Sequence, residues 1–400
     1  MDVCISRCEN ILLGMTVNPQ QKKRIGISGS YGGLNLGDEA ILHVIMADLR
    51  RSIPVEITVF SRDAEDTTRR HNADRVVAAR NLSRGEAKEI IRTLDLFILG
   101  GGGILYDQEA DVYLREVILA LEAKVPVMIY AVSVGPLEQP SVRTRVREVL
   151  DQTALITVRD RKSSQLLEEI GVRQNIIVTA DPALLLESES LTLEQILRSE
   201  AIDPQARLIG LSVREPGPAA PNLNVEHYHR LLANAADFMV DRLEAEVVFF
   251  PMERKVFDVQ HSHGVVAQMR HAQRATVLKR DYAPGEIVSL LTHFQFAVGM
   301  RLHFLIFSAL AGVPFVALPY ATKITGFLED LQIHAPDLQH VSAGQLIANI
   351  DRAWDLREGL RGRIQSALRD LKTRALQNNE LLVQLLTGSG ANSTKPDAGI

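Results

Sequence analysis

Short strand-like runs alternate with longer helical patterns from Arg24 onward, and this alternation restricts the folds open to the chain. Strands that alternate with helices form parallel sheets with helices on both faces. The first predicted strand, RIGISG, precedes a glycine-rich loop and a helix with apolar residues at helical spacing. The first half of the chain thus forms one such unit, with strands predicted at 24–29, 55–61, 94–100, 125–134, 154–160 and 175–183.

A second unit of the same kind begins at Arg207, with strands predicted at 207–215 and 246–252. The polar stretch 187–205 is the predicted crossing between the units, and a helical pattern from about Ser342 closes the fold. This organisation predicts an α/β protein with two Rossmann-like domains, a glycosyltransferase-B-like arrangement and C-terminal helices, with a ligand in the cleft between the domains. The predicted boundaries are a flexible leader at 1–22, domains at 23–190 and 206–335, closing helices at 336–387 and a disordered tail at 388–400.

Composition excludes several classes of function. The 44 Lys and Arg against 49 Asp and Glu give a formal net charge of −5, whereas proteins that coat nucleic acid carry a basic excess. Cys4 and Cys8 both precede the predicted fold, so disulfides, Cys-ligated zinc and a cysteine nucleophile are excluded for the folded body. Charged residues interrupt the N-terminal segment too early for a signal peptide, and both Met1 and Met15 stay open as the natural start.

The longest apolar run does not predict a membrane span. Residues 303–320 carry no Lys, Arg, Asp or Glu, but they include a His, two Pro and a Gly-Val-Pro turn. A buried helix followed by a buried strand is the better interpretation. We therefore expect a cytoplasmic protein without a transmembrane segment and without a nucleic-acid partner.

The glycine-rich loop GSYGGLNLGDEA fits neither of two common phosphate-binding patterns. Its glycines lack the spacing of a dinucleotide fingerprint, and no Lys-Ser or Lys-Thr follows as in a P-loop. Asp38 and Glu39 also place carboxylates at the start of the next helix, where they disfavour a phosphate. Two roles stay open for Asp38: the N-cap of this helix, or a carboxylate that holds or activates a sugar hydroxyl.

Four consecutive glycines, 100–103, follow a predicted strand and lead to ILYD. Each glycine costs about 0.5–1 kcal/mol of ordering entropy relative to Ala, so the close approach of another group is needed to offset it. Tight packing of strand against helix is one explanation, but we favour a ligand because the loop is expected at the carboxyl end of a parallel strand. Gly101, Gly102 and Asp107 are therefore candidate substrate-binding residues.

Cationic residues recur where strands are predicted to end. Arg159, Arg214 and Arg301 each follow an apolar strand pattern, and Lys323 comes three residues after VALPY. Any one of them alone would be expected to be solvated or paired to an acid, but together they predict an anion site at one cleft. His303 begins an apolar helix, and it is either a buried core histidine or, as we favour, a group that transfers protons or contacts a ligand.

Two further histidine pairs, His227 with His229 and His261 with His263, lack a suitably spaced third ligand. Solvated helix faces are therefore predicted for them, and no metal site is predicted.

Four segments together resemble the polysaccharide pyruvyl transferase family: GSYGGLNLGDEAIL, FILGGGGILYD, LITVRD and MRLHFLIFSALAGVPFVALPYATKITGFLEDL. The resemblance covers residues 24–331. It implies phosphoenolpyruvate as the donor co-substrate, no other cofactor, and a glycan or lipid-linked oligosaccharide as the acceptor. The product would be a pyruvate ketal of two glycan hydroxyls, with release of phosphate. The first domain would bind the acceptor and the second the donor.

The resemblance also assigns roles to single residues. His303 is expected to protonate the enol methylene carbon, with Asp38 or Asp107 as the base. Phosphoenolpyruvate carries a charge of about −3, so several cations are expected around it. The family elements fall on Arg301, Leu302 and His303, on Lys323, on Arg159 and on Asp38, with a shorter match at Arg214.

Two other functions stay open from the sequence. One is a nucleotide-sugar glycosyltransferase or epimerase on the same fold, and the other is a non-catalytic protein that binds an anionic ligand. A peripheral position at the inner face of the membrane is also open. The sequence indicates no particular oligomeric state.

Overall fold

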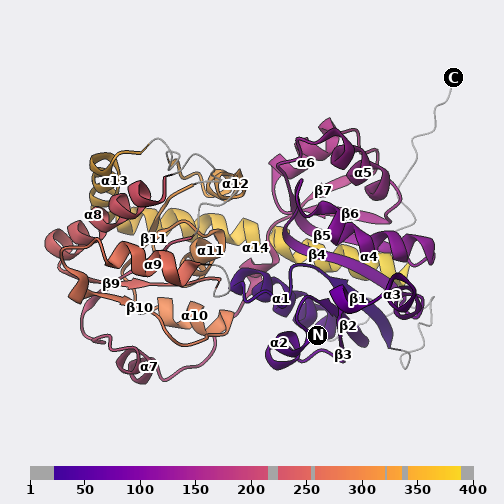
Figure 1. Ribbon diagram of the computed structural model, residues 1–400, viewed down its shortest axis with the longest axis horizontal. Helices are drawn as coiled ribbons and strands as arrows, with labels where there is room; N and C mark the ends of the chain where they lie inside the picture. The colour runs from indigo at the N-terminus through magenta and orange to yellow at the C-terminus, as the bar shows by residue number, and fades with distance from the viewer. Residues whose placement is uncertain (1–21, 215–223, 254–256, 320–321, 336–340, 389–400) are drawn as a thin grey trace, which may run out of the picture.

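The computed structural model describes residues 22–214, 224–253, 257–319, 322–335 and 341–388. It contains two α/β units, each built on one parallel sheet (Figure 1). The alternation of strands and helices in the sequence therefore predicted the fold class correctly. Apart from Lys22 and Gly388, the predicted leader and tail lie outside the described residues.

The first unit holds a seven-stranded sheet in the order β3-β2-β1-β4-β5-β6-β7. All neighbouring strands are parallel, and a central strand such as β5 is buried along its whole length. Burial on both faces explains why these strands read as continuous apolar runs. The strands are β1 (Lys23–Ser28), β2 (Val55–Ser61), β3 (Arg75–Ala78), β4 (Leu96–Leu105), β5 (Val127–Val134), β6 (Leu155–Val158) and β7 (Ile176–Val178). The helices are α1 (Leu36–Ser52), α2 (Ala64–Arg70), α3 (Arg84–Ile91), α4 (Ala110–Glu122), α5 (Pro140–Leu150) and α6 (Arg161–Glu169).

The second unit holds a five-stranded parallel sheet in the order β10-β9-β8-β11-β12. Its strands are β8 (Arg207–Ser212), β9 (Ala245–Phe249), β10 (Ala275–Val277), β11 (Phe296–Gly299) and β12 (Phe315–Ala317). Its helices are α8 (Val225–Leu243), α9 (Asp258–Val266), α10 (Pro284–Leu291), α11 (Leu302–Leu310), α12 (Thr322–Asp330) and α13 (Ala343–Asp355).

The four glycines 100–103 lie within β4, not in a loop after it as the sequence suggested. A Cβ added at Gly101 would lie 2.5 Å from Ile41 Cγ2 of α1. A Cβ at Gly100 would lie 2.4 Å from the Tyr31 hydroxyl. At these two positions, close packing of the strand against α1 and its preceding loop accounts for the missing side chains. Tight packing was the alternative to a bound ligand in the sequence analysis, which favoured the ligand.

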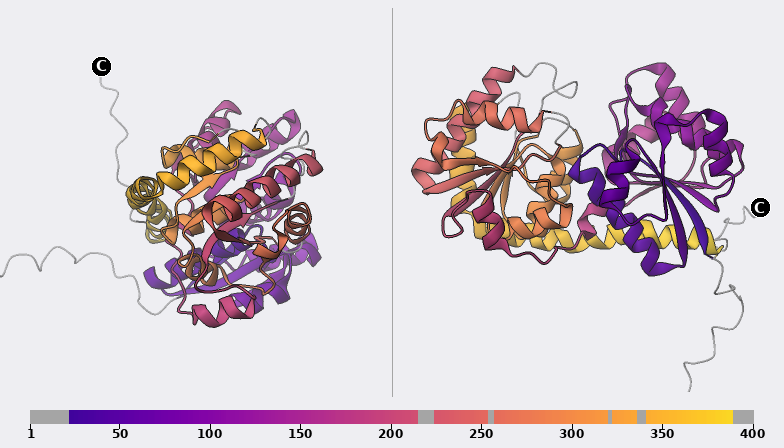
Figure 2. Two further views of the ribbon diagram at one scale, coloured as in Figure 1. Left: turned by 90° about the vertical axis from the view of Figure 1, so that its left-hand side faces the viewer. Right: turned by 60° about the horizontal axis from the view of Figure 1, so that its bottom comes forward.

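The two units are joined at two places. The chain crosses between them through the 3₁₀ helix η2 (Pro182–Leu185) and α7 (Leu193–Ser199). It then returns through α14 (Arg357–Thr387), a helix about 46 Å long that runs along both units (Figures 1 and 2). Asn378 of α14 accepts hydrogen bonds from Thr157 and Thr179 of the first unit at 2.7 and 2.8 Å. Arg361, near the N-terminal end of the same helix, donates to the Gly312 carbonyl of the second unit at 2.9 Å.

One hydrophobic cluster continues from the first unit into the second. It includes Ile41 of α1, Leu290 of α10, Phe307 of α11 and Leu382 of α14, all fully buried. The helices that begin at the interdomain cleft therefore have a shared apolar support behind them. None of the helices in the described residues is long and apolar enough to cross a bilayer.

Candidate functional site

The N-termini of α1 and α11 meet where the two units contact each other. The His303 imidazole of α11 lies against Gly37 of α1, so that a Cβ added there would lie 1.8 Å from Nδ1. The loop before α1 also touches the second unit, because the Leu36 amide donates to the Met252 carbonyl at 2.9 Å. Asn35 forms an antiparallel bridge with Glu253 beside it. The first turn of α1 is thus fixed directly against the start of α11.

Asp38 lies in the first turn of α1 but does not cap it. The N-cap is Asn35, whose side chain accepts from the Gly37 amide at 3.0 Å, so the capping role considered for Asp38 is wrong. The Asp38 carboxyl instead accepts a hydrogen bond from Ser30 and lies near His303. Burial raises the pKa of Asp38, and the positive charge of a protonated His303 opposes this shift. A buried carboxyl next to a histidine can exchange protons with a bound hydroxyl.

His303 is held from its other side by a buried ion pair. Its Nε2 lies 3.4 Å from Asp181 Oδ2, an ion-pair distance without a hydrogen bond of good geometry. The same Asp181 oxygen accepts from Arg159 Nη1 at 2.7 Å. Burial would raise the pKa of Asp181, but Arg159 and His303 outweigh it, and the net shift is downward. Asp181 is therefore ionised and fixed between a guanidinium and the imidazole.

The sequence did not point to Asp181, which lies at the end of the strand predicted at 175–183. It caps η2 by accepting from the Ala183 amide at 2.9 Å. Asp181 follows an apolar strand pattern as the strand-end cations do, so the rule that selects those cations predicts Asp181 when it is applied to acids. Arg159 does reach the interdomain cleft, but its charge is directed to Asp181.

Arg301 lies at the start of α11, where the sequence placed it, but its guanidinium is already neutralised. Its Nε and Nη2 donate to the two oxygens of Asp258 at 3.0 and 2.5 Å, and Nη2 lies 3.0 Å from Glu253 Oε2. Arg301 is 8% exposed and Asp258 is fully buried. An anionic donor would have to compete with two carboxylates for this arginine, contrary to the expectation of an open cation.

The remaining candidates are dispersed around this centre. Arg214 is half-buried after β8, and its carbonyl accepts from the Tyr228 hydroxyl at 3.1 Å. Lys323 belongs to α12, but its side chain lies outside the described residues. Leu302 is buried and lines, with Arg159 and Asp181, a cavity of about 20 Å³, which has room for one water molecule.

Gly102 and Asp107 have different surroundings. A Cβ at Gly102, where φ is +94°, would lie 3.1 Å from the Asp38 carboxylate. Gly102 therefore lies beside the candidate site, and its φ also favours glycine. The two carboxylate oxygens of Asp107 accept from the amides of Glu138 and Gln139 at 2.8 and 3.2 Å. Asp107 thus fixes the loop after β5, which leaves Asp38 as the better placed of the two proposed bases.

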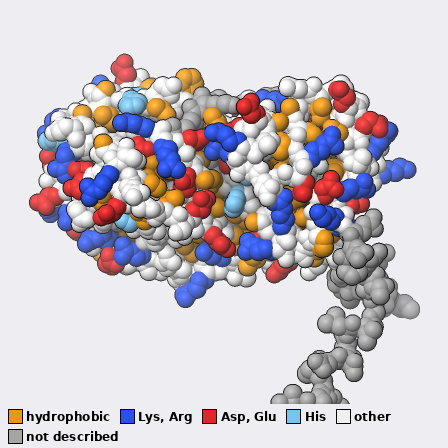
Figure 3. Space-filling view, turned by 90° about the horizontal axis from the view of Figure 1, so that it is seen from below, with side chains coloured by type: hydrophobic (Ala, Val, Ile, Leu, Met, Phe, Trp, Pro, Cys, Tyr) orange, Lys and Arg blue, Asp and Glu red, His pale blue; other side chains and the backbone are white. Residues whose placement is uncertain are grey.

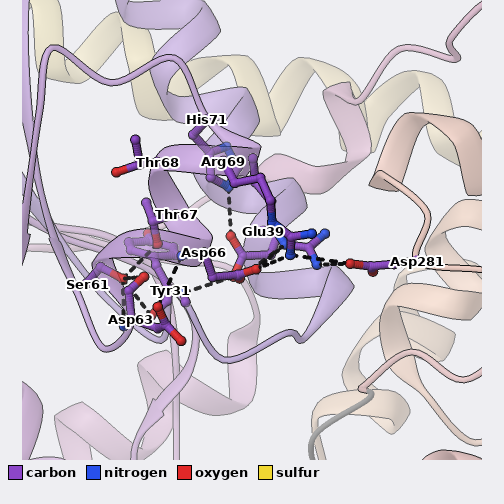
Figure 4. A network of polar contacts seen from close by, with 12 residues as sticks. Tyr31, Glu39, Ser61, Asp63, Asp66, Thr67, Thr68, Arg69, His71 and Asp281 are labelled. Atoms are coloured by element: carbon purple, nitrogen blue, oxygen red, sulfur yellow. Dashed lines mark hydrogen bonds and ion pairs between the residues drawn. The ribbon is translucent and has the colours of Figure 1, made fainter.

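The loop between β1 and α1 is held by a buried network (Figure 4). Glu39, which is fully buried, accepts from the Gly32 amide at 2.9 Å and from His71 Nε2 at 2.7 Å. Arg70 of the neighbouring α2 pairs with Asp66 at 3.0 Å and reaches Asp281 of the second unit at 2.5 Å. Figure 4 shows this chain of contacts running from the loop toward the other unit.

The prediction that both histidine pairs lie on solvated helix faces is only partly correct. His227 and His263 are exposed, as predicted. His229, however, is buried, and its Nε2 lies 2.8 Å from His261 Nδ1. Burial and the neighbouring His261 lower the pKa of His229 to about 4. Among the described residues no group of three or more His, Cys, Asp or Glu side chains is arranged to hold a metal ion.

Acidic and basic side chains are interspersed over the face shown in Figure 3. That face carries no broad patch of one sign, in keeping with the near balance of charges in the sequence.

Comparison with known proteins gives two sequence matches. A model of the family "polysaccharide pyruvyl transferase" matches residues 35–322. The amylovoran biosynthesis protein AmsJ of Erwinia amylovora is 23% identical over 312 residues, which cover 75% of this chain and 74% of AmsJ.

Two solved structures illustrate the similarity of fold. A structure of S. aureus MnaA with UDP has a TM-score of 0.65 at 10% identity, covering 94% of this chain and 99% of MnaA. A protein from Listeria monocytogenes described as a putative UDP-N-acetylglucosamine 2-epimerase has a TM-score of 0.61 at 11% identity, covering 95% of this chain and 100% of that protein. At such low identity the likeness shows the fold alone, which is glycosyltransferase-B-like, as predicted.

Proposed function

Because the chain belongs to the polysaccharide pyruvyl transferase family, we propose that it transfers the pyruvyl group of phosphoenolpyruvate to two hydroxyls of a glycan. The product is a pyruvate ketal, and phosphate is released. The name of AmsJ, an amylovoran biosynthesis protein, supports a role in making a polysaccharide. A lipid-linked oligosaccharide is a suitable acceptor, and the reaction belongs in the cytoplasm or at the inner face of the membrane.

The observation that carries the proposal is the contact between the two helix starts that hold His303 and Asp38. His303 comes from the second unit and Asp38 from the first, so a donor and an acceptor bound to different units would meet between them. Protonation of the methylene carbon by His303 creates a carbocation-like centre at C2. A glycan hydroxyl attacks this centre while Asp38 accepts its proton.

The ion pair behind His303 supports this assignment. A general acid must hold one orientation through the reaction, and Asp181 lies 3.4 Å from the imidazole. Arg159 keeps Asp181 ionised and in place. We therefore assign Asp181 and Arg159 as positioning residues for His303.

We assign the donor to the second unit, where Arg214 and Lys323 supply positive charge for the carboxylate and phosphate. Arg301 instead anchors Asp258 and Glu253 under this site. No cofactor besides the co-substrate is included in the proposal.

The test is the variant His303→Ala, assayed for phosphate release from phosphoenolpyruvate with a panel of nitrophenyl glycosides. General acid catalysis contributes about 100-fold or more, so the rate should fall by at least that factor. Mass spectrometry should find an acceptor heavier by one pyruvate less one water. The matched control is the exposed His263→Ala, which should keep the wild-type rate.

Retention of more than about a tenth of the rate in His303→Ala would reject His303 as the acid. Thermal-shift measurements separate the rival functions. Stabilisation by UDP-N-acetylglucosamine but not by phosphoenolpyruvate would favour a nucleotide-sugar enzyme. Binding of phosphoenolpyruvate without turnover of any glycoside would favour a non-catalytic binding protein.

A further inference from the structure

Arg62, which lies close to Asp38, differs from Arg159 and Arg301 in the contacts of its guanidinium. Arg159 and Arg301 form close ion pairs with Asp181 and Asp258. Arg62 has no carboxylate within ion-pair distance among the described residues, and its hydrogen bonds come from Nη2 alone. Its Nε is buried without an acceptor. A buried donor without a partner is costly, so its retention calls for a functional explanation.

Arg62 and Asp38 lie on either side of Ser30. The Arg62 Nη2 donates to Ser30 Oγ at 3.2 Å and to the Tyr113 hydroxyl at 3.3 Å. The Ser30 hydroxyl in turn hydrogen-bonds Asp38. Arg62 directly follows β2, at the same carboxyl edge of the sheet as Ser30 after β1. Parallel strands bring ligand-binding groups together at this edge.

Two glycines bring the backbone close to these side chains. Gly33 lies alongside Arg62, and a Cβ there would be 3.3 Å from Nη1. Gly102 lies next to Asp38, and the following Gly103 is exposed although it belongs to β4. Arg62 itself is half-buried.

The local charge indicates which ligand fits. Burial acts to lower the pKa of Arg62, but Tyr113, Asp38 and Glu109 raise it, and the net shift is upward. The guanidinium therefore already has two carboxylates in its electrostatic neighbourhood. These carboxylates already act on the guanidinium, and a neutral hydroxyl can both accept from Arg62 and donate to Asp38.

We infer that Arg62 and Asp38 form an acceptor subsite for two hydroxyls of one neutral sugar, in which Asp38 receives the first hydroxyl and Arg62 the second. This inference rests on the proposed function and adds to it a residue that binds the acceptor and the requirement that the acceptor sugar is neutral. The Tyr113 hydroxyl and Ser30 hold the guanidinium in position. Arg62 is a substrate-binding residue in this scheme, and it transfers no proton.

The two hydroxyls explain how the ketal closes. The first hydroxyl oxygen bonds to C2 as His303 supplies a proton to the methylene carbon, which becomes a methyl group. The bond from C2 to the phosphate oxygen then breaks, and the second hydroxyl oxygen, held by Arg62, bonds to C2. Of the two hydroxyl protons, one replaces the proton given by His303 and the other leaves with phosphate.

The test compares Arg62→Gln with the wild type by two binding measurements that do not require turnover. Saturation-transfer NMR titrations follow a panel of neutral nitrophenyl glycosides, and thermal shift follows phosphoenolpyruvate. Loss of a charged hydrogen bond should weaken glycoside binding by roughly 10- to 150-fold, while the phosphoenolpyruvate shift stays unchanged. Arg62→Lys, which keeps one donor, should fall in between.

The matched control is Arg92→Gln, an exposed arginine paired to Glu89, which should bind both ligands as the wild type does. Three outcomes would overturn the inference. They are unchanged glycoside binding in Arg62→Gln, loss of phosphoenolpyruvate binding instead, or binding of no neutral glycoside to the wild type. Failure of the proposed function would give a different result: the wild-type protein would neither bind phosphoenolpyruvate nor release phosphate from it.

Discussion

Replacement of Arg301 by methionine should destabilise the second unit strongly and in a pH-dependent way. The guanidinium makes a two-pronged contact with Asp258, which is fully buried and also accepts from the amides of Met252 and Glu253 at 3.1 Å. Methionine keeps much of the side-chain volume but removes the charge. Asp258 would then lose the cation that contacts both of its oxygens, and the smaller effect of Arg214 would remain.

The expected magnitude follows from the burial of both partners. Breaking a buried ion pair by removing one member costs about 3–5 kcal/mol. For a unit of this size, each kcal/mol corresponds to a shift in Tm of roughly 2–4 °C, so the expected decrease in Tm is roughly 6–20 °C. An exposed ion pair contributes about 0–1 kcal/mol, and Arg84→Met, which removes one of the two cations paired to Glu122 on the surface, is the matched control.

The pH dependence has a definite sign. Burial raises the pKa of Asp258, and Arg301 opposes that shift, so loss of Arg301 raises the pKa further. When the pKa of a carboxyl is higher in the folded state than in the unfolded chain, ionisation favours unfolding. The free energy of unfolding is therefore lowered at every pH above the pKa of the unfolded chain. The penalty in Arg301→Met should therefore be largest near pH 7 and shrink as the pH falls toward 4.

The assay is differential scanning calorimetry of wild type, Arg301→Met and Arg84→Met between pH 7 and pH 4.5. A decrease in Tm for Arg301→Met no larger than that for Arg84→Met would refute the argument from burial. A penalty that stays constant over this pH range would show that Asp258 does not take up the proton, and the electrostatic account would be wrong.

Two other predictions use single contacts. Gly37→Ala would place a Cβ 1.8 Å from His303 Nδ1, so the imidazole must move and phosphate release should fall by about 100-fold or more, whereas Gly85→Ala, with nothing within 4 Å, should be neutral; equal rates for the two variants would contradict the placement of His303. His229 has a pKa of about 4 in the folded state, below its ordinary value of 6.5, so it should reduce stability progressively as the pH falls from about 6.5 to 4. Calorimetry of His229→Asn should show a weaker decline in Tm over that range, and an identical decline would exclude His229 as a source of the pH dependence.

Much of the candidate site was predictable because one rule applies to every parallel sheet. Residues just after apolar strands gather at one edge, and this rule alone selected Arg159 and the segment of Arg301 and His303. The same rule applied to VEITVFS would have found Arg62, which follows it directly.

It was harder to predict which cations are available to a ligand than to predict where the cations lie. Arg301 and Arg159 both reach the expected region, but they pair with Asp258 and Asp181, which lie 43 and 22 residues away in the chain. A local pattern contains no information about such partners. Asp107 was selected for similar reasons, and its oxygens bind the backbone of a loop that follows another strand.

The sequence by itself determined the alternation of strands and helices, and hence two parallel sheets whose carboxyl edges carry the chemistry. It could do so because apolar periodicity and strand ends are local properties of the chain. Only the tertiary structure decided that the His303 imidazole lies against Gly37 and that Asn35, not Asp38, caps α1. It also decided that Arg301 forms close ion pairs, whereas among the described residues Arg62 hydrogen-bonds hydroxyl groups. Those outcomes depend on contacts between segments that are distant in the sequence. In the interior, where polarity is low, the presence or absence of a single charged or hydrogen-bonding partner determines whether a side chain is neutralised or remains available to a ligand.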